Sequence, residues 1–489
     1  MKKSISFLLI PALSGLVACG PADKSKEEAP LIEKQTLTLT SDLMTPEVLW
    51  AFGRVSGQEV SPDGKTVLYG ITYYDIEQNK GNRELYTVGA SGEDPKRLTF
   101  TPKSEYDAGW RPDGKKIGYL SAQSGSMQLW EINPDGSGAI QITNVENGIT
   151  GFKYSPDQTR LLYTKEVFLE NKFAKLYKGL LKASGRLMDD LLYRHWDTWV
   201  DSYSHVFYAD YDGTKISNDK DIMPGEPYQS PLKPFGGIEQ VCWSIDGKTI
   251  AYTCQKMVGK AATLSTNSDI YLYSLETGET RNMTEGMMGF DIAPLYSPDG
   301  KYIAWQSMER DGFESDKDRL FILNTQTGEK TYATKNFDQN TGSVCWTPDS
   351  KDIYFTSDWH GAFQIYKYTL PSGKISQITT GLQDYATISL AGDKIIAAKQ
   401  TMSFPTELFT ITPEDGAAQQ ITFTNKELLD QLTMGKVEER WMQTFDNQDM
   451  QVFIIYPPHF DPLKKYPAIL YCKGGPQGPL SQNFHYRWN

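Results

Sequence analysis

The sequence predicts an all-β protein whose main part is a seven-bladed β-propeller. A tight-turn pattern recurs seven times along the 489 residues, at intervals of 44 to 53 residues where nothing is inserted. A second hairpin pattern recurs between those turns, so that each period holds four strands. Aromatic residues make up 12% of the chain and glycines number 41, which is typical of a strand-rich protein with many turns.

The first pattern is a Ser-Pro-Asp-Gly-Lys turn, or a variant of it, between two apolar strands. A serine or threonine side chain can accept a hydrogen bond from the backbone, proline presets φ, and aspartate caps the turn. Glycine then adopts the left-handed conformation that lets the two strands fold back as a hairpin. The copies are Ser61–Lys65, Arg111–Lys115, Ser155–Gln158, Ser244–Lys248, Ser297–Lys301, Thr347–Lys351 and a degenerate Ala391–Lys394.

The second pattern opens with alternating apolar residues, passes a glycine-containing turn and closes on a threonine. Its copies are Leu85–Thr99, Leu129–Thr143, Ile270–Thr284, Leu320–Thr334, Ile365–Thr379 and Leu408–Thr422. Two hairpins in each period make a four-stranded sheet, which is the unit of a propeller blade. Seven turns therefore predict seven blades, over residues 46–424.

One interval between turns, from Asp157 to Asp246, is much longer than the others. Its excess has apolar residues at helical spacing, so we predict a helical insertion in the third blade near residues 166–197. The apolar positions are Phe173, Leu176, Tyr177, Leu180, Leu181, Leu187, Leu191 and Leu192. The aromatic residues that follow either cover the blade or face a substrate; they are Trp196, Trp199, Tyr203 and Phe207.

Residues 1–18 have the pattern of a lipoprotein signal peptide. Two lysines precede an apolar stretch, Ile5 to Val17, that is too short to span a membrane. Small residues precede Cys19, whose thiol we expect to carry a lipid; the alternative is a plain secretory peptide with an incidental cysteine. Residues 19–45 are predicted to be a disordered tether. We therefore expect a bacterial cell-envelope protein that is lipid-anchored to a membrane, and Gly20 favours the outer membrane.

The composition argues against several functional classes. The formal net charge of -12 disfavours a nucleic-acid partner. The five histidines are scattered and show no ligand spacing with cysteines, so we expect neither a metal nor another cofactor. Five cysteines are too few for a disulfide scaffold in a chain of this length, and the offsets of Cys242 and Cys254 across one hairpin turn favour free thiols.

Beyond the last repeat the pattern changes. Asn425 to Leu432 predicts a short helix with an asparagine cap. Residues 438–456 predict a hairpin. The apolar run from Tyr466 to Tyr471 predicts a buried strand, which enters a loop that contains Gly474 and Gly475.

Residues 461–477 resemble the start of the α/β-hydrolase domain in the prolyl oligopeptidase family, in the branch of dipeptidyl and acylaminoacyl peptidases. The resemblance rests on the run Tyr-Pro-Ala-Ile-Leu at 466–470 and on Gly-Gly-Pro at 474–476. The motif Arg-His-Trp-Asp-Thr-Trp at 194–199 also resembles one of that branch. The resemblance implies that the propeller is followed by the first strands of a truncated α/β-hydrolase domain, with residues 425–489 forming a linker and that start.

The same resemblance implies a role for the glycine loop. In the family a backbone N–H of this loop helps to hold the negative charge that develops on the substrate, and Gly474 and Gly475 match the loop. A glycine suits the task because no side chain shields its N–H. Lys473 stands where the family often has histidine. Short peptides would be the substrates.

No catalytic residue is expected in this chain. The family's serine nucleophile lies in a Gly-x-Ser-x-Gly turn, and this motif does not occur in the 489 residues. Aspartate and histidine follow the serine in the family, whereas His485 follows no candidate nucleophile. We therefore expect a substrate-gating propeller, inactive alone, whose partner is the missing hydrolase domain or a complementing chain. The alternative hypothesis is a lipoprotein with a non-enzymatic binding propeller of the TolB type.

Overall fold

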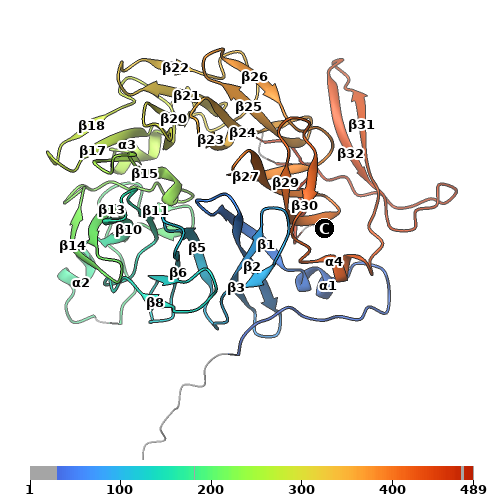
Figure 1. Ribbon diagram of the computed structural model, residues 1–489, viewed down its shortest axis with the longest axis horizontal. Helices are drawn as coiled ribbons and strands as arrows, with labels where there is room; N and C mark the ends of the chain where they lie inside the picture. Colours follow the sequence, from blue (N-terminus) through green and yellow to red (C-terminus); the bar gives the residue numbers. More distant parts are fainter. Residues whose placement is uncertain (1–29, 181, 475–477, 488–489) are drawn as a thin grey trace, which may run out of the picture.

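Seven four-stranded antiparallel sheets form a ring, and the first strand of each sheet lies toward its centre (Figure 1). The computed structural model describes residues 30–180, 182–474 and 478–487. Each sheet is one blade, and its strands pair with their neighbours in chain order. The predicted seven-bladed β-propeller is confirmed.

The strands of blades 1 to 4 follow the chain, with one interruption in blade 3. Blade 1 holds β1 (Arg54–Val60), β2 (Thr66–Asp75), β3 (Lys80–Gly89) and β4 (Lys96–Arg97), and blade 2 holds β5 (Glu105–Trp110), β6 (Ile117–Ser121), β7 (Gln128–Ile132) and β8 (Ile140–Gln141). Blade 3 holds β9 (Gly151–Tyr154), β10 (Arg160–Phe168), β13 (Ser202–Tyr211) and β14 (Ile216–Asp221). Blade 4 holds β15 (Val241–Trp243), β16 (Thr249–Cys254), β17 (Asp269–Ser274) and β18 (Thr280–Asn282).

Blades 5 to 7 are uninterrupted. Blade 5 holds β19 (Asp291–Tyr296), β20 (Tyr302–Ser307), β21 (Arg319–Asn324) and β22 (Lys330–Tyr332). Blade 6 holds β23 (Gly342–Trp346), β24 (Asp352–Trp359), β25 (Ala362–Thr369) and β26 (Lys374–Gln377). Blade 7 holds β27 (Asp384–Ala391), β28 (Lys394–Thr401), β29 (Phe404–Ile411) and β30 (Ala418–Gln420).

The remaining elements are short and lie between or beyond the blades. They are the helices α1 (Pro46–Ala51), α2 (Lys172–Leu176), α3 (Gly259–Leu264) and α4 (Lys426–Leu429), the 3-10 helix η1 (Ile238–Gln240), and the two-stranded hairpins β11 (Arg194–His195) with β12 (Thr198–Trp199) and β31 (Val437–Gln443) with β32 (Asp449–Ile455). The predicted hairpin at 438–456 is confirmed. Among the described residues, none of these helices has the length and apolar character needed to cross a membrane.

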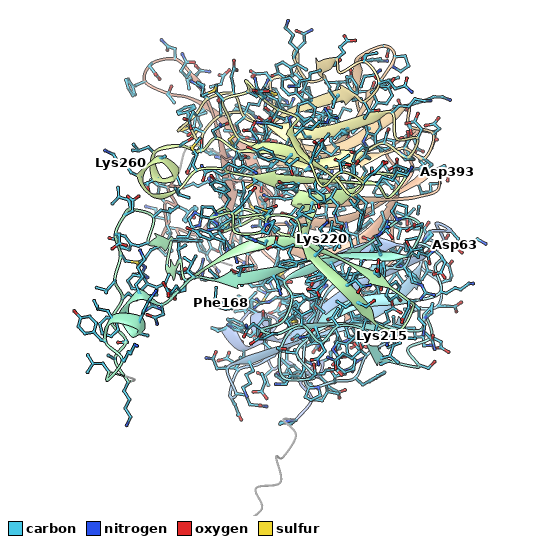
Figure 2. All side chains as sticks on the ribbon, turned by 90° about the vertical axis from the view of Figure 1, so that its left-hand side faces the viewer. Asp63, Phe168, Lys215, Lys220, Lys260 and Asp393 are labelled. Atoms are coloured by element: carbon cyan, nitrogen blue, oxygen red, sulfur yellow. The ribbon has the colours of Figure 1, made fainter. Side chains whose placement is uncertain are left out.

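The predicted turns connect the first strand of each blade to the second. In blade 1 the Ser61 hydroxyl donates to Asp63 Oδ1 at 2.6 Å and accepts from the Thr66 amide at 2.9 Å. The Asp63 carboxylate also accepts from the Lys65 amide at 3.1 Å. The Ser61 hydroxyl and the Lys65 amide hold the pKa of Asp63 below its ordinary value, and Gly64 adopts a left-handed φ of 73°. These turns lie on one face of the ring, where Figure 2 labels Asp63 and Asp393.

The threonine that closes the second hairpin has a structural task that the repeat alone did not show. In six blades its hydroxyl accepts a hydrogen bond from the amide of the residue 14 positions earlier, in the third strand. In blade 4 the Thr284 hydroxyl accepts from the Ile270 amide at 3.0 Å and donates to Asp269 Oδ1 at 2.7 Å. The buried hydroxyl therefore satisfies an amide that no neighbouring strand reaches.

Replacing Thr284 with valine should lower the free energy of unfolding by about 1–3 kcal/mol, because the Ile270 amide would stay buried without an acceptor. The measurement is urea unfolding followed by tryptophan fluorescence. Thr277 is exposed in the turn of the same hairpin, so Thr277→Val is the matched control and should change little. Equal costs for the two variants would contradict the role given to the buried hydroxyl.

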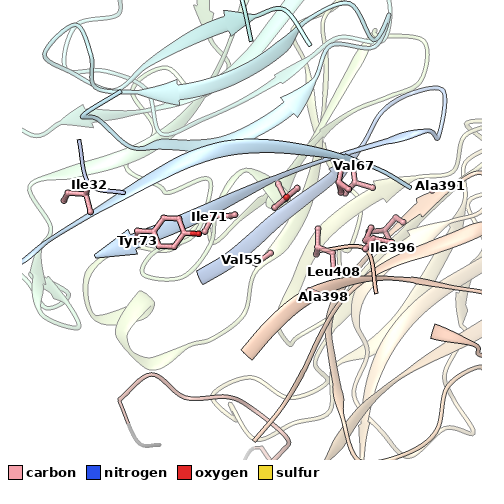
Figure 3. Close-up of a cluster of buried hydrophobic side chains, with 12 residues drawn as sticks. Ile32, Val55, Val67, Ile71, Tyr73, Ala391, Ile396, Ala398 and Leu408 are labelled. Atoms are coloured by element: carbon pink, nitrogen blue, oxygen red, sulfur yellow. The ribbon is translucent and has the colours of Figure 1, made fainter. Parts of the chain in front are cut away.

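The ring closes without a strand shared between its first and last blades. An apolar cluster joins them instead: Val67 and Ile71 of blade 1 pack with Ile396 and Leu408 of blade 7 (Figure 3). Polar contacts support this seam, among them a hydrogen bond between the side chains of Gln58 and Thr387 at 2.6 Å. The seam therefore relies on side chains, whereas each blade relies on backbone pairing.

The predicted helical insertion near residues 166–197 is largely wrong. Strand β10 continues to Phe168, and among the described residues of this segment only those of α2, five residues long, are helical. Most apolar side chains of the segment are exposed, for example Leu176 (66%) and Leu180 (54%). Periodic apolar residues stabilise a helix only when they pack against another surface, and the described part of the protein places no such surface against this segment.

Two predictions beyond the ring need correction. The apolar run from Tyr466 to Tyr471 forms no strand and is exposed, because among the described residues no strand lies beside it to satisfy its backbone. The helix predicted after Asn425 is confirmed only as the single turn α4, and Asn425 does not cap it with its side chain. That side chain instead exchanges two hydrogen bonds of 2.8 Å with the backbone of Gly53, across the seam.

Candidate functional site

The inner strands of blades 1 to 4 enclose a cavity of about 740 Å³ near the ring centre. β1 contributes Ser56 to Glu59, β5 contributes Tyr106 to Trp110, and β9 contributes Phe152 to Tyr154, with η1 and β15 completing the wall. The wall combines aromatic rings with charged groups, which is the composition expected of a site for a polar organic molecule.

The charged groups of this cavity have perturbed pKa values. Glu59 lines the cavity with an exposed side chain, and desolvation by the surrounding protein raises its pKa to about 7, with Lys153 opposing the shift. Desolvation likewise lowers the pKa of the Lys153 ammonium, which donates to the Val241 carbonyl at 2.6 Å. Desolvation also raises the pKa of Asp107, and the Arg83 guanidinium opposes this. The cavity therefore holds a carboxyl group that exchanges its proton near neutral pH.

β-Bulges in the first strands of the blades shape the surface near the ring centre. The pairing with the second strand shifts between Ser56 and Glu59, Tyr106 and Gly109, Ile292 and Leu295, Gly342 and Cys345, and Tyr385 and Ile388. Four of the bulges contain a residue with left-handed φ: Gly57, Asp107, Ala293 and Ser343. A bulge redirects side chains and commonly lies beside a functional site. These positions could not be predicted from the sequence, since among the four residues only Gly57 is a glycine that could have marked a bulge.

A larger groove of about 870 Å³ lies between blades 4 and 5 on the turn face. Its acidic residues include Asp246 and Asp299, whose carboxylates already accept hydrogen bonds from their own turns. We therefore attribute the groove to the spacing of two blades and not to a site of chemistry.

The predicted oxyanion residues are only partly described. Gly474 is exposed, and a Cβ atom built on it would meet no heavy atom within 4 Å. The neighbouring Lys473 Nζ donates to the Gly478 carbonyl at 2.8 Å, across the loop. Gly475 and the predicted lipid-attachment residue Cys19 lie outside the described residues. In the described ranges no three His, Cys, Asp or Glu side chains gather as metal ligands would.

The Arg-His-Trp-Asp-Thr-Trp motif forms the small hairpin β11–β12 on the face opposite the turns. Its first and last residues pack together, with the Arg194 guanidinium 4.9 Å from the centroid of the Trp199 ring. Trp196, at the tip, has a left-handed φ of 54°, is 74% exposed and meets Phe235 edge-on at 5.3 Å. The motif therefore builds a turn, and its residues do not join the cavity or the Gly474 loop.

Several known proteins are similar to this chain in sequence. A family model described as the TolB β-propeller domain matches residues 236–431. Dipeptidyl-peptidase 5 of Porphyromonas gingivalis is 47% identical over 452 residues, which cover 92% of this chain and 66% of that protein. Dipeptidyl-peptidase 5 of Porphyromonas endodontalis is 44% identical over 452 residues, covering 92% of this chain and 65% of that protein. The chain thus spans just under two thirds of the length of these relatives.

Solved structures show the same fold. An acylaminoacyl peptidase in complex with Z-Gly-Gly-Phe-chloromethyl ketone matches with a TM-score of 0.71 and 18% identity, over 91% of this chain and 64% of that chain. The β-propeller domain of the trilobed protease from Pyrococcus furiosus, described as having an open velcro topology, matches with a TM-score of 0.52 and 16% identity, over 76% of this chain and 99% of that chain.

The fold of this chain is the propeller fold seen in these two solved structures. Over most of its length the chain is similar to proteins named dipeptidyl-peptidase 5.

Proposed function

We propose that this chain is the substrate-gating propeller portion of a cell-envelope serine peptidase that cleaves short peptides, of the dipeptidyl- or acylaminoacyl-peptidase type. The observation that carries the proposal is the 47% identity to a dipeptidyl-peptidase 5 across 92% of the chain. A closed ring admits short, flexible peptides and excludes folded proteins by size. The inner cavity, with its aromatic wall and acidic groups, supports the passage or binding of such peptides.

Gly474 has one role in this proposal. Its exposed backbone N–H would hold the negative charge that develops on the substrate carbonyl during attack by the serine. The serine, aspartate and histidine would come from outside these 489 residues, either in one longer chain or in a complementing one. The chain alone would then bind peptides without cleaving them.

The assay compares the 489-residue chain with a form extended by the coding sequence that follows codon 489. The extended form should release chromophore from a dipeptidyl substrate and should be blocked by a serine-directed inhibitor, whereas the shorter form should release none. Turnover by the shorter form would refute the proposed division of labour. A coding sequence without Gly-x-Ser-x-Gly, Asp and His would favour the binding propeller.

A pair of substitutions in the extended form tests Gly474 itself. Gly474→Pro removes the N–H and should lower kcat about 10²–10³-fold. Gly474→Ala keeps the N–H, and the space around the glycine accepts a methyl group, so this control should stay close to the parent. Equal activity of the proline and alanine variants would remove Gly474 from the mechanism.

The cell-envelope location is part of the proposal and rests on the sequence pattern of residues 1–19. Growth with labelled palmitate should label the chain in its bacterial host, and Cys19→Ser should abolish the label. Persistence of the label in the Cys19→Ser variant would contradict lipid attachment at this residue.

A further inference from the structure

Two segments flank Gly474 along the chain, and both rest on the rim of the propeller. Before Gly474, the hairpin β31–β32 reaches blade 6, where Gln451 Nε2 donates to the His360 carbonyl at 2.7 Å and the Trp441 ring meets the His360 ring at 5.0 Å. After Gly474, residues 480–486 return to blades 6, 7 and 1; we call them the return segment. The described parts of the loop between them touch the propeller far less, and Ile469 and Leu470 are almost fully exposed.

The hairpin and the return segment meet at Gly361, between β24 and β25 of blade 6. A Cβ atom on Gly361 would lie 2.6 Å from the Phe453 ring of the hairpin and 3.0 Å from the Leu480 carbonyl of the return segment. Gly361 also has a left-handed φ of 67°. Only glycine fits a backbone that two other segments approach so closely.

The return segment is anchored by its own side chains and backbone. Phe484 is only 3% exposed and packs edge-on against Phe52, beside Leu49 of α1. The backbone amide of Gln482 donates to Asp384 Oδ1 at 3.2 Å, and that of Phe484 donates to Gln400 Oε1 at 3.4 Å. These partners lie at the start of blade 1 and in blade 7, so the return segment crosses the seam of the ring.

The guanidinium of Arg54, in blade 1, is a second anchor for the return segment. The Arg54 guanidinium lies 4.1 Å from the centroid of the Tyr74 ring, 4.3 Å from that of Tyr486 and 4.7 Å from that of Trp50. Two of its nitrogens are buried and have no hydrogen-bond partner in the described protein, so the aromatic faces supply its stabilisation. Tyr486 belongs to the return segment, and the rings of Trp50 and Tyr74 come from the propeller side of the contact.

We propose that Phe484 and Tyr486 are positioning residues that hold the loop carrying Gly474 in place on the propeller. Leu480 lies six positions after Gly474, so an anchored Leu480 keeps Gly474 within about 20 Å even when the chain between them is fully extended. On the other side the end of β32 lies nineteen positions before Gly474, which is a much looser tether. The return segment is therefore the shorter of the two tethers that limit where Gly474 can lie.

A proposed role for Gly474 in oxyanion stabilisation rests on the proposed function, whereas its positioning by the return segment does not. The propeller would then influence catalysis in two ways: through the contacts that it makes with the return segment at the seam, and through the inner cavity. Its contacts with Phe484 and Tyr486 would place a backbone donor in the orientation that attack on a peptide carbonyl requires.

A native cysteine beside Gly474 allows a direct test. Cys472 is exposed, Cys242 and Cys254 are buried, and Cys345 is half-buried. In a background that carries Cys19→Ser and Cys345→Ser, one spin label is attached to Cys472 and a second to Glu77→Cys, which lies in the exposed β2–β3 turn of blade 1. Pulsed electron paramagnetic resonance then gives the distribution of distances between loop and propeller. A Cys472→Ser variant should accept only the label at position 77.

Phe484→Ala should broaden this distribution at least about two-fold, because the loop loses its short tether. Gly361→Ala displaces the same segment from the propeller side and should broaden it as well. Phe445 is fully exposed at the tip of the β31–β32 hairpin, so Phe445→Ala is the matched control and should leave the distribution unchanged. Near-ultraviolet circular dichroism verifies that each variant is folded.

An unchanged distribution in both Phe484→Ala and Gly361→Ala would overturn the positioning role. If the extended form did not cleave the dipeptidyl substrate, the proposed function would be refuted, whereas the distance measurement would still test the positioning role. In the extended form, positioning also predicts that Phe484→Ala lowers kcat with little change in KM, since the substrate cavity lies elsewhere.

Discussion

Replacing Glu131 with leucine is expected to lower the free energy of unfolding by about 3–5 kcal/mol. Glu131 is on β7 of blade 2, and its side chain is fully buried. Its Oε1 accepts a hydrogen bond from the Tyr154 hydroxyl at 2.8 Å and another from the Tyr211 hydroxyl, both of blade 3. The Arg111 guanidinium lies 3.7 Å from Oε2. Leucine would leave the two tyrosine hydroxyls without their acceptor and would remove the charge that faces Arg111, which still donates to Asp113.

The tyrosines can only donate to Glu131. Burial and the Glu131 carboxylate raise the pKa values of Tyr154 and Tyr211, so both phenols keep their protons over the whole working range of pH. Glu131→Gln keeps one acceptor oxygen but loses the charge that faces Arg111, and it should cost less than the leucine variant. The measurement is denaturant unfolding of the three proteins, which gives the order wild type, glutamine, leucine. A leucine variant as stable as wild type would show that apolar packing replaces this polar link.

Local turn chemistry explains why the ring was predictable from the sequence. Ser61, Asp63 and Gly64 interact within five residues of one another, so their pattern determines a hairpin wherever it occurs. The closing threonine was visible as a repeat for the same reason, since its bond spans a constant 14 residues.

Groups whose partners come from another blade could not be predicted. Glu131 and Tyr211 are 80 residues apart, and Phe484 meets Phe52 from the opposite end of the chain. The helix predicted in the third-blade insertion did not form. Apolar residues at helical spacing show only a tendency to form a helix, and the described protein places no surface against them. Gly474 was identified through a family resemblance, whereas the inner cavity and its bulges needed the ring to be assembled first.

A second large effect is expected from the pH dependence of stability. Glu105 of β5 is fully buried and accepts hydrogen bonds from Thr99 at 3.0 Å and from Thr101 at 2.6 Å. Desolvation, reinforced by the nearby Glu84 carboxylate, raises the pKa of Glu105 to about 8. In the unfolded chain the same group titrates near 4.3. The folded protein therefore binds the Glu105 proton more tightly than the unfolded chain does.

The sign of the effect follows from that difference. The stabilising contribution is complete below pH 4 and is lost as the pH rises toward 8, because the unfolded chain releases the proton first. The loss between pH 5 and pH 8 is on the order of 3 kcal/mol for this group. Glu105→Gln has no proton to release and retains an amide that can serve the two threonines, so its stability should change much less over this interval. Urea unfolding at pH 5 and pH 8 measures both proteins, and parallel losses in wild type and variant would show that Glu105 is not the group responsible.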